Sequence, residues 1–178
     1  MIEAQRGRQV VVLASGDPMF FGIGASLSRH FSTQDMQIIP FPSSLSLAAS
    51  RMAWPLQEVR TVSVHGRPFE LLAPHILPGE KILLLSNDGT TPVKAAALLK
   101  AKGFGQSRLT VLEHLGGTKE KSISGSADSW SHENCADLNV LAIECIAAPD
   151  AAVFSPVSGL PDHAFENDGQ LTKRDIRA

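Results

Sequence analysis

Residues 10–27, VVVLASGDPMFFGIGASL, constrain the fold more than any other part of the sequence. Residues 10–14 form a continuous apolar and mostly β-branched run, which is typical of a buried strand. A Ser-Gly-Asp-Pro loop at residues 15–18 interrupts the run, and apolar side chains then recur at helical spacing over residues 20–31. The pattern predicts a strand, a tight loop and a helix, which is the repeating unit of α/β proteins.

The Ser-Gly-Asp-Pro loop has two interpretations. In open α/β sheets, ligands bind just beyond the carboxyl ends of strands, which is where Gly16 and Asp17 lie. Gly16, Gly22 and Gly24 would allow a close approach to the backbone because they lack a Cβ atom. Asp17 is equally a good N-cap for a helix that begins at the following proline. On spacing alone, a ligand-binding loop and a simple helix start both stay open.

The composition of the 178 residues argues against several functional classes. A formal net charge of −2 provides no basic surface for nucleic acid or for an anionic membrane. No apolar run approaches the length of a membrane-spanning helix, and the polar N-terminus lacks a signal-peptide pattern. The two cysteines and six histidines match no metal-ligand spacing, so no metal site is expected. We expect a cytoplasmic protein with reduced thiols.

Strand and helix patterns alternate along the rest of the chain. Strands are expected at residues 36–39, 59–64, 81–85, 109–112, 120–123 and 138–146. Helices are expected at residues 45–54, 69–75, 92–102 and 127–133. Residues 40–42 (Pro-Phe-Pro) are expected to form a hinge between two lobes, and the Pro- and Ala-rich stretch after residue 146 a linker. This order predicts an α/β protein with a mixed sheet in its second half.

Small polar residues follow three of the predicted strands, at residues 15–17, 86–91 and 115–117. If these loops converge, they frame one cleft between the lobes. The chain has no Ser-His-Asp or Cys-His pattern for nucleophilic catalysis. No nucleophile is therefore singled out among these loops.

Six segments, in order, resemble the tetrapyrrole methylase family: ASGDPMFFGIG, PFPSSLSLAASRMAWP, VSVHGRP, SNDGTTP, LEHLGG and LNVLAIEC. Six ordered matches are far more specific than one Gly-Asp-Pro loop. The resemblance implies a two-lobed α/β fold with S-adenosylmethionine bound in a folded shape between the lobes. Residues 1–41 would belong to the first, Rossmann-like lobe and residues 42–147 to the second.

The two ends of the chain carry further expectations from the resemblance. The family usually begins with a strand and a glycine-rich turn that this sequence does not contain, so we expect a first lobe truncated at its N-terminus. Residues 148–178 resemble the join to a second module in bifunctional members. They are expected to be a linker and the start of a methyltransferase and decarboxylase module.

The activity implied by the resemblance is methyl transfer from S-adenosylmethionine to a meso carbon of a precorrin macrocycle in cobalamin biosynthesis, in a homo-oligomer. Catalytic roles are implied for Asp17 and for Arg67, whose planar guanidinium suits the substrate's carboxylates. Arg51 is a further candidate for such pairing. The cofactor-binding residues implied are Gly16, Asp17, Phe20, Gly22, Ile23, Ser43, Ser44, Ser86, Asn87, Asp88, Leu115, Asn139 and Val140.

Other functions stay open at this point. One alternative is a tetrapyrrole methylase with another methylation site, although the VSVHGRP segment and the C-terminal tail favour the precorrin-6Y type. Another is a non-catalytic domain that only binds the cofactor. A generic nucleotide-binding module is disfavoured because the loop lacks the P-loop lysine and the full GxGxxG spacing. Arg51 has a simpler interpretation as a solvated helix residue. His65 and His114 are expected to be structural.

Overall fold

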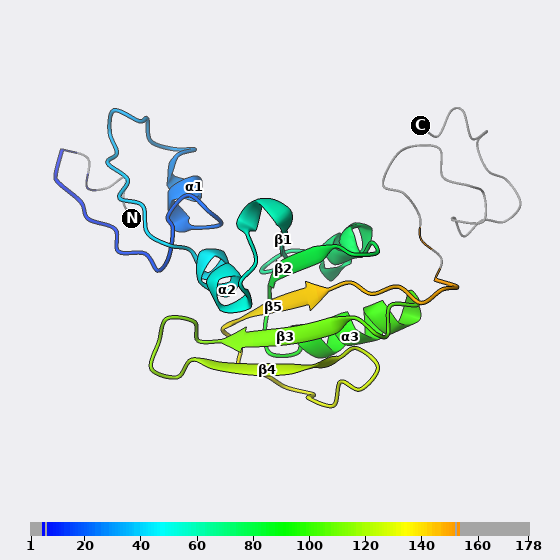
Figure 1. Ribbon diagram of the computed structural model, residues 1–178. Helices are drawn as coiled ribbons and strands as arrows, with labels where there is room; N and C mark the ends of the chain where they lie inside the picture. The colour runs from blue at the N-terminus through cyan, green and yellow to red at the C-terminus, as the bar shows by residue number, and fades with distance from the viewer. Residues whose placement is uncertain (1–4, 6, 152, 154–178) are drawn as a thin grey trace, which may run out of the picture.

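A mixed sheet of five strands, in the order β1-β2-β5-β3-β4, forms the centre of the protein (Figure 1). The computed structural model describes residues 5, 7–151 and 153. β1 and β2 run parallel, and the other three strand pairings are antiparallel. The mixed sheet predicted for the second half of the chain is confirmed. The strands are β1 (Arg60–Ser63), β2 (Lys81–Leu85), β3 (Arg108–Glu113), β4 (Lys121–Ser126) and β5 (Asn139–Glu144).

The two most apolar strands, β2 and β5, lie next to each other in the interior of the sheet. Leu83 of β2 pairs with Ala142 of β5, and both are fully buried. A strand that is buried on both faces reads as an unbroken apolar run. The edge strand β4 has the sequence KSISGS and is largely exposed. A short polar edge of this kind disfavours pairing with a strand of another molecule.

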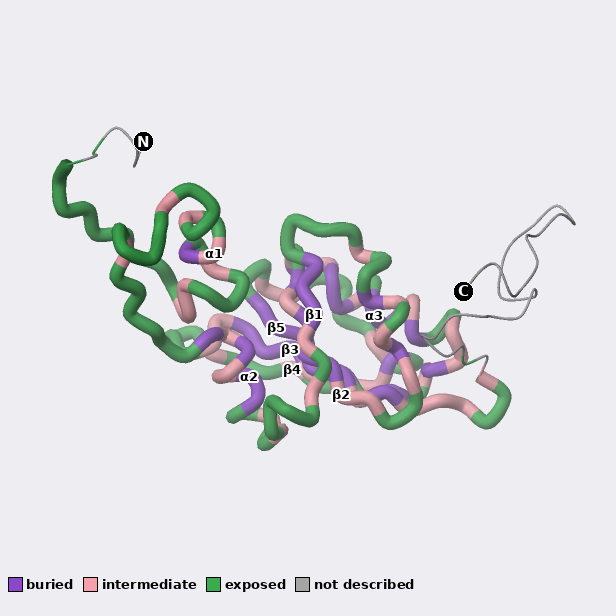
Figure 2. Tube along the Cα trace, turned by 90° about the horizontal axis from the view of Figure 1, so that it is seen from above, coloured by how far each residue is buried: buried purple, intermediate pink, exposed green. Residues whose placement is uncertain are grey.

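One helix covers each face of the sheet. α2 (Ser44–Met52) packs on Val140 and Ala142 of β5. α3 (Thr91–Ala101) packs in the cluster that contains Leu141 and Ile143. Successive residues of a strand point to opposite faces, so these pairs assign the helices to opposite sides. Buried positions accordingly concentrate in the strands and in the helix sides that face them (Figure 2).

Most predicted elements after residue 42 are confirmed, with bounds shifted by a few residues at most. The segment Phe69–His75, predicted as a helix, is a 3-10 helix, and it follows a shorter one at Leu56–Glu58. Pro74 lies inside it and has no N–H to donate to an α-helical bond. The helix predicted at residues 127–133 is wrong, because this stretch forms turns and irregular backbone. Ser126 begins it by accepting a bond from the Ser129 N–H through its Oγ.

The N-terminal segment, residues 7–41, differs most from the prediction. The strands predicted at residues 10–14 and 36–39 are absent, and the predicted helix at 20–31 is reduced to α1 (Ile23–Leu27). A strand needs a neighbouring strand for its backbone groups. No backbone hydrogen bond joins residues 9–14 or 36–41 to any other described residue. The apolar run is instead extended and open, and Leu13 is 91% exposed.

Some expectations lie outside the described residues, including the linker beyond residue 153 and the helix start predicted near Thr172. Among the described residues, no helix is long and apolar enough to cross a membrane. Cys135 and Cys145 carry free thiols, as expected.

Candidate functional site

The edge of the sheet where β2 and β3 end is also where β5 begins, because β5 runs antiparallel to both. Leu85 of β2 pairs with Val140, and Glu113 of β3 pairs with Asn139. α2 packs on this part of the sheet, beside the N-terminal segment (Figure 1). The loop after β3 lies against the middle and end of α2, through Leu47 and Arg51. We refer to the loops after β2 and β3, together with α2, as the sheet-edge site.

A buried pair of side chains forms the floor of the sheet-edge site. The Ser86 hydroxyl donates to Asn139 Oδ1 over 2.6 Å. The Asn139 amide donates in turn to the backbone carbonyl of Ala136 over 2.7 Å. Both side chains are almost fully buried. Ser86 and Asn139 thus fix the loops to each other, and their side-chain groups are already used within the protein.

The loop after β2 is organised around the Asp88 carboxylate. It accepts bonds from the hydroxyl and the N–H of Thr90 and from the side-chain amide of Asn87. These bonds, the Thr90 hydroxyl first, lower the pKa of Asp88 to about 2. Asn87 Oδ1 also accepts the N–H of Gly66 over 3.1 Å. Asp88 therefore stays ionised and holds a loop that is tied to the turn after β1.

The Ser-Gly-Asp-Pro loop lies against the start of α2. Gly16 has φ +70°, and a Cβ atom there would lie 3.7 Å from Ser43 Cα. Asp17 Oδ1 accepts the Met19 N–H over 2.8 Å, which is a contact within the turn. The helix-cap interpretation of Asp17 is wrong, because α1 begins at Ile23 with Gly22 as its N-cap and has no side-chain cap bond. A Cβ atom on Gly22 would collide with the carbonyl oxygen of Asp17. The tight fold of this loop thus requires glycine at position 22 and leaves the second Asp17 oxygen without a bond to the described residues.

The start of α2 carries free backbone donors. Ser43 is the N-cap, as predicted, and its Oγ accepts the Ser46 N–H over 3.1 Å. The N–H groups of Ser44 and Leu45 donate to no oxygen among the described residues. Unpaired amides and the helix dipole favour a negative group at such an end.

The loop after β3 is fixed to α2. The Arg51 guanidinium binds the Glu120 carboxylate through Nε and through Nη2, the latter at 3.1 Å, and Glu120 also accepts the Gly116 N–H over 2.7 Å. These bonds lower the pKa of Glu120, with the Arg51 bond the larger cause. Leu115 is half-buried against the cluster under α2. Arg51 therefore positions this loop, and its guanidinium already has a partner.

Arg67 lies beyond the end of β1, in the turn that is tied to Asn87. Its guanidinium carbon is 5.6 Å from the centre of the Phe21 ring. The Phe20 and Phe21 rings are 5.0 Å apart, so both aromatic side chains lie near this turn. Among the described residues, no carboxylate lies within 4 Å of Arg67.

The other predicted site residues differ in accessibility. Phe20, which lies just before α1, and Ile23, the first residue of α1, are both exposed. Val140 is 3% exposed and belongs to the core under α2, so its side chain is closed to a ligand. The sequence did not single out Glu120, Asp137 or Phe21. Asp137, which lies just before β5, accepts the Gly89 N–H over 3.0 Å. The one sequence feature that could have singled out Phe21 as a site residue is that an aromatic residue stands before a glycine in a loop.

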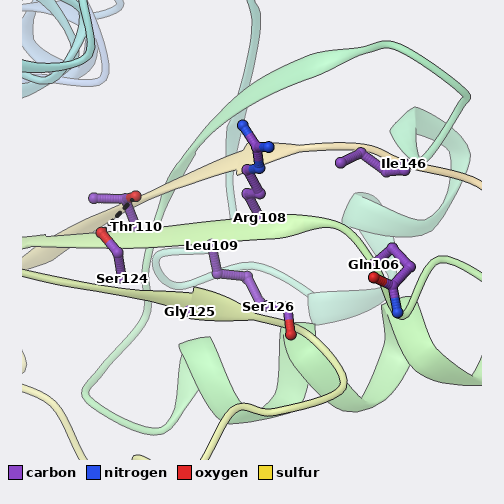
Figure 3. Close-up of a pocket in the computed structure, with 8 residues that line it drawn as sticks. All are labelled: Gln106, Arg108, Leu109, Thr110, Ser124, Gly125, Ser126 and Ile146. Atoms are coloured by element: carbon purple, nitrogen blue, oxygen red, sulfur yellow. Dashed lines mark hydrogen bonds between the residues drawn. The ribbon is translucent and has the colours of Figure 1, made fainter.

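The cavities of the protein only partly coincide with the sheet-edge site. A cavity of about 1090 Å³ lies within the N-terminal segment and includes Gly16 and Ile23. A second depression lies over β3 and β4, where Thr110 and Ser124 share a 3.0 Å hydrogen bond and Arg108 and Gln106 border it (Figure 3). None of the predicted site residues lines this second depression. We therefore place the candidate site at the edge loops, with Gly16 and Ile23 shared with the N-terminal cavity, and not in the depression over β3 and β4.

The sequence matches the family described as Tetrapyrrole (Corrin/Porphyrin) Methylases over residues 1–130. The chain belongs to the tetrapyrrole methylase family. A curated relative from Sinorhizobium sp, a precorrin-6Y C(5,15)-methyltransferase [decarboxylating], is 50% identical over 177 residues. That alignment covers 99% of this chain and 43% of the relative. A cobalt-precorrin-7 C(5)-methyltransferase from Salmonella typhimurium is 34% identical over 67% of this chain and 59% of the relative. The chain thus spans about half the length of these methylases.

Solved structures of tetrapyrrole methylases share the fold. The precorrin-6Y methylase of Archaeoglobus fulgidus superposes with a TM-score of 0.52 at 30% identity, covering 73% of this chain and 59% of that one. Uroporphyrin-III C-methyltransferase of Thermus thermophilus, solved in complex with S-adenosylhomocysteine, gives a TM-score of 0.54 at 21% identity. That superposition covers 72% of this chain and 62% of the other.

Proposed function

We propose that this chain provides the methylating part of a precorrin methyltransferase, which transfers a methyl group from S-adenosylmethionine to a meso carbon of the macrocycle in cobalamin biosynthesis. One observation carries the proposal. The chain is 50% identical, over 99% of its length, to a precorrin-6Y C(5,15)-methyltransferase. The position of the loops after β2 and β3 at the sheet edge that α2 covers supports it.

The residues at the sheet-edge site fit S-adenosylmethionine in chemical character. The free N–H groups of Ser44 and Leu45 suit the carboxylate of its methionine part. The second Asp17 oxygen is available to a cationic sulfonium. The half-buried Leu115 side chain offers apolar surface to the adenosine. The complete proposed set is Gly16, Asp17, Phe20, Gly22, Ile23, Ser43, Ser44, Ser86, Asn87, Asp88, Leu115, Asn139 and Val140.

The protein's part in this chemistry is positioning. When bound, S-adenosylmethionine supplies the electrophilic methyl group, so no protein nucleophile is required. Asp17 would hold the positive end of the cofactor by charge, and Arg67 would hold a substrate carboxylate. The buried Ser86–Asn139 pair and the ionised Asp88 keep the loops in place. A fixed arrangement of this kind accelerates a bimolecular transfer by holding the two reactants together.

A second candidate is methylation at one meso carbon only. The 34% identity to a cobalt-precorrin-7 C(5)-methyltransferase favours it, because that relative is named for a single position. Product analysis separates the two candidates, since they differ in the number of methyl groups added to the macrocycle.

The division of the chain into parts, its location in the cell and its oligomeric state also belong to the proposal. We propose lobes at residues 1–41 and 42–147, and a linker with the start of a second methyltransferase and decarboxylase module at residues 148–178. The Sinorhizobium relative, of which the alignment covers 43%, is more than twice as long as this chain, which supports the proposal of a second module. A cytoplasmic location and a homo-oligomeric state complete the proposal.

Calorimetric titration with S-adenosylhomocysteine tests the proposed cofactor. We expect saturable binding of S-adenosylhomocysteine and no binding of NAD at the same concentration. The variant Ser44→Pro removes the Ser44 N–H at a helix position where proline is tolerated, so it should bind more weakly. Arg60→Gln, which changes a charge at the opposite end of β1, should bind equally well. Tighter binding of NAD than of S-adenosylhomocysteine would contradict the proposal.

A further inference from the structure

Phe21 has an unusual backbone conformation. Its φ is +56°, in the left-handed region that non-glycine residues seldom adopt. The following residue, Gly22, packs tightly against the carbonyl of Asp17 and fixes the loop at this point. The Phe21 ring is 44% exposed, so core burial does not offset the strain. Strained residues of this kind cluster at functional positions.

The conformation of Phe21 directs its ring towards Arg67. The guanidinium carbon lies 5.6 Å from the ring centre, within the range of a cation–π contact. Such a contact restricts a long side chain that would otherwise sample many rotamers. Because no described carboxylate lies within 4 Å of Arg67, the ring holds the guanidinium without neutralising its charge.

The backbone of Arg67 is fixed to the sheet-edge site. Its N–H closes the turn of residues 64–67 on the carbonyl of Val64, at 3.2 Å. The Val64 N–H donates to the Leu85 carbonyl at 3.0 Å, and the Gly66 N–H donates to Asn87 Oδ1 at 3.1 Å. The contact between Phe21 and Arg67 thus links the Ser-Gly-Asp-Pro loop to the loop after β2.

We propose that Phe21 is a positioning residue that holds the Arg67 guanidinium at the sheet-edge site, where Arg67 binds a carboxylate of the acidic tetrapyrrole substrate. The inference rests on the proposed function for the class of substrate. A planar guanidinium forms two parallel hydrogen bonds with a carboxylate only when it is correctly oriented. Stacking on the exposed Phe21 ring provides that orientation before the substrate arrives.

A double-mutant cycle tests the link between the two residues. The probe is uroporphyrin, an acidic tetrapyrrole, and its dissociation constant is measured by titration against the protein. We expect Phe21→Leu and Arg67→Gln each to weaken binding by about fivefold to tenfold. The double variant should bind no more weakly than Arg67→Gln alone, because Phe21 acts through Arg67. Phe21→Trp should restore affinity to within about twofold of the wild type, because tryptophan keeps the cation–π contact.

Control variants separate positioning from folding. Phe21→Gly relieves the left-handed strain, so it should keep the melting temperature while losing affinity for uroporphyrin. Arg60→Gln removes an arginine from the other end of β1 and should leave uroporphyrin affinity unchanged. The dissociation constant for S-adenosylhomocysteine should be the same in all Phe21 and Arg67 variants.

Three results would overturn the proposal while the proposed cofactor function stands. The first is unchanged uroporphyrin affinity in Phe21→Leu, and the second is independent, multiplying effects of the two substitutions. The third is wild-type protein that binds S-adenosylhomocysteine but not uroporphyrin. Failure of the wild type to bind either ligand would instead contradict the proposed function itself.

Discussion

Asp17 and Asp88 both lie in loops of the sheet-edge site, but their surroundings differ. Asp88 accepts three hydrogen bonds, and these lower its pKa to about 2. Asp17 accepts one bond, from the Met19 N–H, among the described residues. Asp88 is therefore an internal anchor of its loop, whereas Asp17 combines a structural contact with an oxygen that is open to a cation.

The substitution Asp17→Asn separates these two roles of Asp17. Asparagine keeps an oxygen that accepts the Met19 N–H, so the free energy of unfolding should change by less than about 0.5 kcal/mol. Loss of the negative charge should weaken binding of cationic S-adenosylmethionine about fivefold, or roughly 1 kcal/mol, and leave neutral S-adenosylhomocysteine unaffected. Calorimetry with the two ligands measures the difference. An equal loss of affinity for both ligands would show that the Asp17 charge does not act on the sulfonium.

The lowered pKa of Asp88 predicts how stability depends on pH. A carboxylate with a depressed folded-state pKa stabilises the fold above its unfolded pKa, and this contribution is lost as the pH falls through the folded value of about 2. Asp88→Asn should therefore melt at a lower temperature than the wild type at neutral pH. The gap should close between pH of about 4 and about 2. Thermal melts across this range measure it, and a gap that persists at the acidic end contradicts the assigned bonds.

At the level of elements, α2 connects the sheet to the sheet-edge site. Its buried side, including Leu45 and Ala48, packs on the sheet, while its first turn presents free amides. Ser43→Ala removes the cap bond to the Ser46 N–H and should lower the free energy of unfolding by about 1 kcal/mol. Ser50→Ala, on the exposed side of the same helix, is the matched control and should have almost no effect. Denaturant unfolding measures both variants, and equal stability of the two would contradict the capping role.

Some elements were predicted well because both of their faces are buried in the same apolar surroundings. β2 has its predicted bounds of 81–85, since a strand buried on both faces needs an unbroken apolar run. Residues 10–14 have the same local pattern but no described partner, so the prediction of a strand there is wrong. Local patterns report which side chains suit a strand, and they do not report whether a neighbouring strand is present to bind its backbone.

The candidate site shows a similar division between what was predictable and what was not. The strands that end at residues 85 and 113 finish at the same edge of the sheet, because β5 lies between them and runs antiparallel to both. Whether these loops frame one cleft with residues 15–17 stays a prediction. The bond between Ser86 and Asn139 joins residues 53 positions apart, and no sequence pattern encodes that pairing. The contact of Phe21 with Arg67 depends on the left-handed backbone conformation of Phe21. Glycine is the residue usually found in that conformation, so a phenylalanine in the sequence gave no reason to expect it.

At the scale of the whole molecule, the described residues differ sharply in burial and in backbone hydrogen bonding. The sheet, α2 and α3 share two buried apolar clusters. The segment at residues 7–41 contains one short helix and two extended stretches without backbone partners among the described residues. Stability is therefore concentrated in the part of the chain after residue 42.

Hydrogen exchange should reveal this difference directly. We expect the amides of β2 and β5 to exchange slowest, because they are buried and bonded on both sides within the sheet. Amides of residues 9–14 and 36–41 should exchange within the first time point, because they have no backbone acceptor among the described residues. Peptide-level mass spectrometry measures both groups. Strong protection of residues 9–14 would show that this run is bound to a partner strand.

The central proposal is that this chain provides the part of a precorrin methyltransferase that transfers the methyl group from S-adenosylmethionine. An isotope-labelled methyl donor tests this proposal most directly. Purified protein is incubated with S-adenosylmethionine that carries a labelled methyl group and with the precorrin substrate. Mass spectrometry and NMR of the macrocycle then locate the label. We predict that the label appears on a meso carbon between two rings. A macrocycle without label, or with the label on a ring carbon, would contradict the claim.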